Sequence, residues 1–286
     1  MGILWGIIGT LLGSISAPFW KKSLNMTEIS NYLFTTIGNL FNVLVVIVFL
    51  FLWFYNIEKL TWTFVLLICL ATVIFLIKVP IMQNIYKKEK ISALMPYENL
   101  NKIITVIISF LFLSKLNPVS SNTFYITLIA IWVIIGFTVD WKNMVMPKSF
   151  RNITIRQWLQ SIHTLIVWIA IGITSDKMYF MSYVPLITIV MMLVIMKNKE
   201  LKVLSTLPKS FYKNRIAASI TWSSWFIIWL FLISKYGIIV STLLSFIGMG
   251  MTMVFSFFII WEKPAKKDIL LTVIVSSLVG LGFFLK

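Results

Sequence analysis

Apolar stretches of 18 to 25 residues, separated by short polar links, follow one another along the whole chain. A helix needs about 20 apolar residues to cross the hydrocarbon of a bilayer, where backbone groups can be satisfied only internally. The pattern therefore predicts an all-α membrane protein with ten transmembrane helices. The expected spans are 2–20, 32–54, 60–82, 91–114, 122–139, 154–174, 179–196, 214–234, 237–261 and 268–285.

A pattern in the first half of the chain recurs in the second. Each copy has an apolar stretch, then a proline, then a glycine eighteen residues later: Pro118 and Gly136 within 92–136, and Pro264 and Gly282 within 241–282. We therefore predict two five-helix repeats, 1–140 and 152–286, joined by a linker at 141–151. Because five is odd, the second repeat enters the membrane from the opposite side, so the repeats are inverted.

The composition supports a bilayer and argues against nucleic acid as a partner. Hydrophobic residues make up 59% of the chain and the mean hydropathy is +0.95, which a water-soluble domain of this size could not bury. The net charge is +16, but the basic residues fall between apolar stretches rather than along one face. Contacts of these basic residues with lipid headgroups explain that placement better than contacts with nucleic-acid phosphates would.

The basic residues also predict an orientation. Of the 25 lysines and arginines, eighteen lie on links after odd-numbered spans, counting Arg156 and Arg215 with those links, and five lie on the other side. The positive-inside rule places the side with eighteen in the cytoplasm, so both termini are expected outside the cell membrane. Lys21 and Lys22 are expected to end the first span at the headgroups.

Metal and cofactor chemistry is not indicated. Cys69 is the only cysteine and His163 the only histidine, so a His/Cys zinc site is excluded. The sequence contains no glycine-rich phosphate loop and no nucleophile motif. We expect no cofactor, no bound metal and no enzymatic activity.

Charged side chains inside the predicted spans are the main candidates for a site, because such groups are costly in hydrocarbon. Lys78 and Glu98 each lie ten residues from Lys88 in the link between two spans, so they share one depth and could form an ion pair. Glu98, Asn101 and Lys102 share one helical face, which must look into a cavity. Either this face binds the polar part of a solute, or Glu98 only neutralises a neighbouring lysine.

Three further residues complete the candidate site. Gln160 and His163 lie in one span; His163 either packs in a helix interface or carries a coupling proton, since imidazole titrates near neutral pH. Trp222, close to Trp225, is either a packing or anchoring residue or a stacking surface for a solute. Helix packing is the commoner role for both kinds of side chain.

The chain resembles the EamA-type members of the drug/metabolite transporter superfamily. The resemblance rests on the two similar stretches 94–136 and 243–282, on ten spans in fewer than 300 residues, and on Lys21 just after the first span. It implies two inverted repeats around a central cavity lined mainly by spans 1, 3, 4, 6, 8 and 9. Members move amino acids, nucleotide sugars, drugs and other metabolites. Lys115 departs from the family pattern, in which an acidic residue, as at Glu262, is more usual.

We therefore expect a multi-pass transporter of small polar solutes (amino acid, sugar-type or drug-like) that works by alternating access. Two lysines against one glutamate within the spans favour an anionic or zwitterionic small-molecule substrate. The alternative is an intramembrane enzyme or a helper subunit acting on lipid-linked substrates. Such enzymes use paired carboxylates, whereas the acidic residues here are scattered singly. Substrate identity, coupling ion, direction and oligomeric state are left open by the sequence.

Overall fold

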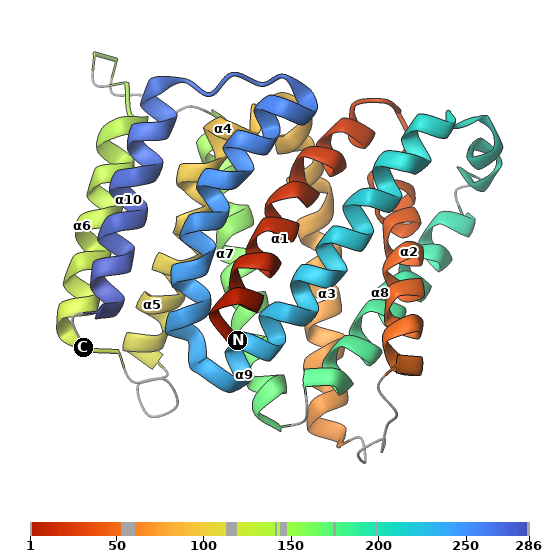
Figure 1. The fold of residues 1–286 in the computed structure, drawn as a ribbon, viewed down its shortest axis with the longest axis horizontal. Coiled ribbons are helices and arrows are strands. Elements are labelled where there is room, and N and C mark those ends of the chain that lie inside the picture. Colours follow the sequence, from red (N-terminus) through yellow and green to blue (C-terminus); the bar gives the residue numbers. More distant parts are fainter. Residues whose placement is uncertain are drawn as a thin grey trace.

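A computed structural model of the chain describes residues 2–52, 61–112, 119–140, 142–143, 148–173, 176–197 and 200–284. The regular elements in these ranges are all helices (Figure 1), which confirms the prediction of an all-α protein. Several predictions lie partly or wholly outside the described residues: the linker at 141–151, the features Lys115 and Pro118 of the first repeat, and one end of each of the spans predicted at 32–54, 60–82, 91–114, 154–174 and 268–285.

Most predicted spans coincide with a single helix. The elements in chain order are α1 (Gly2–Leu24), α2 (Asn31–Leu52), α3 (Trp62–Lys88), α4 (Ile91–Leu94), the 3-10 turn η1 (Met95–Asn99), α5 (Leu100–Phe112), α6 (Ser121–Thr138), α7 (Lys148–Ile173), α8 (Asp176–Lys197), the 3-10 turn η2 (Glu200–Thr206), α9 (Lys209–Ile260) and α10 (Lys266–Phe284).

The helix α9 covers two predicted spans, 214–234 and 237–261. Its 52 residues would extend about 78 Å as a straight helix at 1.5 Å per residue, which exceeds any bilayer. Instead α9 turns back at the lower end of the bundle (Figure 1), so that it has a first and a second arm. Gly9 of α1 lies against Ile228 of the first arm, and Gly248 of the second arm lies against Thr10. The reversal was predicted, but the helix continues through it instead of ending between the two predicted spans.

The span predicted at 91–114 is interrupted at Pro96. Proline has no N–H to donate to the carbonyl one turn earlier, so the α-helix gives way to the 3-10 turn η1 before α5 begins. A short 3-10 stretch within a helix often marks a functional site. The interruption places Glu98 and Asn99 at the junction of η1 and α5.

Helices from the two halves of the sequence pack against one another throughout. The helix α1 contacts both arms of α9, while α7 contacts α3 and α5; α2 packs on α8, and α6 packs on α10 (Figure 1). Each of the three hydrophobic clusters contains residues from both halves. The halves therefore share one core and are not separate folding units in this structure.

The outside of the bundle is apolar where a water-soluble protein would be polar. Along α3, Leu66, Leu70 and Val73 are exposed, while Lys78 on the same helix is only 5% exposed. By length and hydropathy, three helical stretches among the described residues could cross a membrane: Asn31–Val48, Trp62–Lys88 and Ser121–Thr138. The number of spans beyond these three stays a prediction.

Candidate functional site

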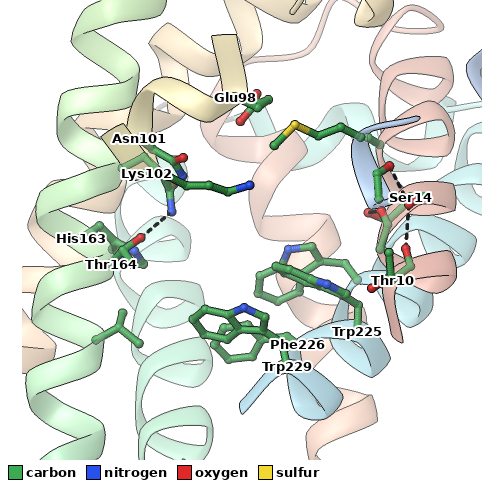
Figure 2. Close-up of a pocket in the computed structure, with 18 of the residues that line it drawn as sticks. Thr10, Ser14, Glu98, Asn101, Lys102, His163, Thr164, Trp225, Phe226 and Trp229 are labelled. Atoms are coloured by element: carbon green, nitrogen blue, oxygen red, sulfur yellow. Dashed lines mark hydrogen bonds between the residues drawn. The ribbon is translucent and has the colours of Figure 1, made fainter. Parts of the chain in front are cut away.

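A cavity of about 580 Å³ lies at the centre of the bundle. Its walls come mainly from α1, α3, η1 and α5, α7 and both arms of α9, which are the elements that cover predicted spans 1, 3, 4, 6, 8 and 9. The structure places all seven candidate residues along this one cavity: Lys78, Glu98, Asn101, Lys102, Gln160, His163 and Trp222. Figure 2 shows Glu98, Asn101 and Lys102 on one side and an aromatic cluster on another.

One wall is made by the small residues of α1. A Cβ on Gly9 would come within 2.6 Å of Ile228, and a Cβ on Gly13 within 2.6 Å of Trp225, so α9 approaches the α1 backbone directly. The hydroxyl of Ser14 donates to the carbonyl of Gly248 at 2.9 Å. The two arms of α9 are thus both fixed to α1 beside the cavity.

Lys78 enters the cavity from α3, two residues before Pro80. Its Nζ donates to Oε1 of Gln160 at 2.6 Å, and the Nε2 of Gln160 donates in turn to the hydroxyl of Thr164 at 3.2 Å. The amine also lies 5.0 Å from the centre of the Phe75 ring. A buried lysine needs such partners because its desolvation is costly.

Glu98, the acidic partner predicted for Lys78, pairs with a different residue. Glu98 forms an ion pair with Arg156 of α7, whose guanidinium also lies over the ring of Tyr86. Arg156 was counted with a link between spans, but it lies within α7 and is 8% exposed. Its position four residues before Gln160 is the signal that could have placed it on the cavity face.

Asn101 and Lys102 follow the interruption in the helix. The Nζ of Lys102 donates a long hydrogen bond of 3.4 Å to Oδ1 of Asn99. The backbone carbonyl of Asn101 accepts from Ser161, while its side-chain Oδ1 is buried and accepts from no described residue. Figure 2 shows Lys102 extending into the cavity from the same wall as Asn101.

His163 and Trp222 have mainly aromatic neighbours. The Nε2 of His163 shares a hydrogen bond with the hydroxyl of Tyr183, and Phe75 lies next to both rings. Trp222 stacks on Phe226, with ring centres 5.2 Å apart and ring planes 7° apart. Each of the two alternatives given for these residues stays open, because both side chains also line the cavity.

The sequence analysis did not place Arg215, Asn39 and Asn42 in the site. Arg215 was counted with a basic link, but it is buried on α9, with its guanidinium 4.3 Å from the Phe34 ring centre and Nε donating to the Phe34 carbonyl. Asn42 donates to Asn39 at 3.2 Å and accepts from Ser223 at 2.9 Å. All three line the cavity.

The cavity carries an excess of basic side chains. Among the described residues that line it, four are lysine or arginine and one is acidic: Lys78, Lys102, Arg156 and Arg215 against Glu98. Because the acid is already paired with Arg156, the rest of the cavity favours an anion.

A second charged cluster joins three helix ends outside the cavity. The Nζ of Lys21 lies 2.5 Å from Oε1 of Glu262 and donates to the Glu89 carbonyl, also at 2.5 Å. The other carboxylate oxygen of Glu262 accepts from the Ile91 N–H at 2.7 Å. Lys21 is 4% exposed, so its side chain contacts other helices rather than the outside of the bundle.

No family model matches this sequence, and no curated protein matches it either. The fold and the cavity define the chain as an all-helical bundle with helices apolar enough for a membrane and a basic, partly aromatic cavity inside.

Proposed function

We propose that this chain is a multi-pass membrane transporter that carries small polar solutes by alternating access. The observation that supports this most is the inversion of polarity: charged and amide side chains gather around a central cavity, while the outer faces of the helices are apolar. Ionisable groups within membrane proteins face cavities and mark solute pathways.

A bilayer environment accounts for the outer surface. Exposed apolar side chains occur on several helices, among them Leu66, Trp132 and Phe258, each between 64% and 69% exposed. Exposed indoles also lie near helix ends, at Trp62 before the body of α3 and at Trp261 after α9. Tryptophan is enriched at the two membrane interfaces.

Ten spans in two inverted repeats, 1–140 and 152–286, are part of the proposal. The packing supports it. If each span is exchanged with the span five places away in the sequence, the following contacts made by spans of the first repeat become those made by the corresponding spans of the second. The contact of α1 with both arms of α9 becomes that of α7 with α3 and α5, while the pairs α2–α8 and α6–α10 are each converted into themselves. Inverted repeats of this kind allow two alternating states around one site.

The proposed solute is anionic or zwitterionic. Lys78 and Lys102 approach the cavity from α3 and α5, and the Arg156–Glu98 pair adds one positive and one negative group. A zwitterion could bind between these groups, whereas a simple cation would meet an excess of basic side chains.

The test is solute flux from proteoliposomes loaded with a mixture of amino acids, sugar phosphates and carboxylates, measured by mass spectrometry. We expect wild-type protein to release at least one anionic or zwitterionic solute saturably. Lys102→Met and Glu98→Gln should reduce that flux, whereas Lys213→Met, the same charge change at an exposed position, should not. Correctly inserted wild-type protein that moves no solute would contradict the proposal and favour an enzyme or a helper subunit.

A further inference from the structure

Four aromatic side chains of the first arm of α9 line one side of the cavity. Trp222, Trp225, Phe226 and Trp229 have the spacing i, i+3, i+4 and i+7, which places them on one helical face. Phe226 stacks between Trp222 and Trp229, at 5.2 and 5.9 Å between ring centres and with interplanar angles of 7° and 21°. The rings form a continuous surface rather than separate packing contacts.

This surface is open to the cavity. Phe226 is 8% exposed, but the three tryptophans are only half-buried and all four line the cavity. Buried indole N–H groups ordinarily donate a hydrogen bond. Those of Trp222, Trp225 and Trp229 donate to no residue that the structure describes, and the Nε1 of Trp225 lies close to Gly13 of α1.

The basic groups lie on a different wall from the rings. Figure 2 shows Lys102 and Glu98 on the side of α5 and η1, with the Trp225, Phe226 and Trp229 cluster across the open space. Lys78 and Arg156 add to the basic side from α3 and α7. A molecule that bridges the two walls needs a flat apolar body at one end and a charged group at the other.

We propose that the solute is an aromatic organic anion whose ring stacks on the α9 cluster and whose carboxylate or comparable acidic group faces Lys102 and Lys78. This inference rests on the proposed transport function and specifies its substrate class. A cavity of about 580 Å³ lies within the usual range for sites that hold a small organic ligand.

An aromatic cation is the competing ligand, because tryptophan clusters also bind cations over their ring faces. The charge of the cavity decides between them. Four basic side chains and a single acid, itself paired with Arg156, line the described part of the cavity, so a cation would be repelled.

The experiment compares matched probes by calorimetry on the purified protein. Phenylacetate has the ring and the charge, cyclohexylacetate lacks the aromatic ring, phenylacetamide lacks the charge, and phenethylamine reverses it. We expect phenylacetate to bind more tightly than cyclohexylacetate, by about 2- to 13-fold from the strength of aromatic pairing. Phenylacetamide and phenethylamine should bind more weakly still.

Two variants assign the contributions to the two walls. Trp222→Leu should remove the preference for the aromatic ring, and Lys102→Met should remove the preference for the anion over the amide. Trp132→Leu, at an outward position that is 69% exposed, should leave both preferences unchanged. The ring and charge preferences of wild-type protein test the proposal even where a variant does not fold.

The outcomes separate this inference from the transport function. Equal binding of phenylacetate and cyclohexylacetate, tighter binding of phenethylamine, or no binding of any aromatic anion would overturn the proposed substrate class. If solute flux from proteoliposomes persists in that case, the transport function stands. Loss of the proposed function itself would be seen as the absence of flux for every solute.

Discussion

Lys21 at the end of α1 offers the most quantitative test of the packing. Its Nζ joins Glu262 after α9 and the Glu89 carbonyl after α3, and its side chain is 5% exposed against 15% for that of Glu262. Lys21→Met would remove the cation and leave the carboxylate largely buried, still accepting from the Ile91 N–H. The three helix ends would lose their common contact.

The expected cost follows from the burial of the pair. Removing one partner of a buried ion pair costs about 3–5 kcal/mol. Because Glu262 keeps the Ile91 hydrogen bond and is partly exposed, we expect the lower end, about 3 kcal/mol. At about 2–4 °C per kcal/mol, the melting temperature should fall by roughly 6–12 °C.

The assay is thermal unfolding of purified protein followed by tryptophan fluorescence. Lys22→Met is the matched control, because Lys22 makes no ion pair with any described residue. The double variant Lys21→Met/Glu262→Gln should melt above Lys21→Met, since it leaves no buried charge unpaired. Equal melting temperatures for Lys21→Met and Lys22→Met would refute the reasoning.

Two further predictions concern the cavity walls. Gly13→Ala would place a methyl group 2.6 Å from the Trp225 ring, so we expect destabilisation of about 1–3 kcal/mol, seen as a lower melting temperature. Gly172→Ala, which meets nothing within 4 Å, should be neutral or slightly stabilising; equal effects would contradict the packing. Glu98→Gln should lower both stability and flux, because it leaves Arg156 without its acid. Adding Arg156→Met should restore stability but not flux, and recovery of both would limit the pair to a role in folding.

The helices could be predicted because the pattern of apolar residues is continuous and the links are short. Most expected spans match one helix, and even the reversal within α9 was expected, since the stretch from 214 to 261 is too long for one crossing and has Lys235 between two apolar segments. The exact path there could not be predicted, because the link at 235–236 is only two residues long and contains no proline that would end the helix. The interruption at Pro96 was not predicted, since the span at 91–114 was expected to be continuous.

The candidate residues could be found by the cost of burying polar groups, but their partners could not. Glu98 had Lys78, Lys102 and Arg156 within its reach in principle, and only the packing of α7 against η1 selects Arg156. Arg156 and Arg215 were assigned to links because each lies near the start of an apolar stretch. The helices α7 and α9 begin earlier than the apolar pattern does, at Lys148 and Lys209, so both arginines lie within helices.

The central claim is that the cavity is a water-filled site that opens in turn to each side of the membrane. Asn101 lines it, and Ile129 on α6 is an outward-facing control that is 52% exposed. Each position would be changed to cysteine after replacement of the only native cysteine, Cys69→Ser. A membrane-impermeant thiol reagent would then be applied to vesicles of each orientation.

We predict that the reagent labels cysteine at position 101 in vesicles of both orientations, and so from both sides of the membrane. Cysteine at position 129 should be labelled from neither side. Labelling of position 101 from one side only would contradict alternating access. Labelling from neither side, with the protein folded and inserted, would contradict the water-filled cavity itself.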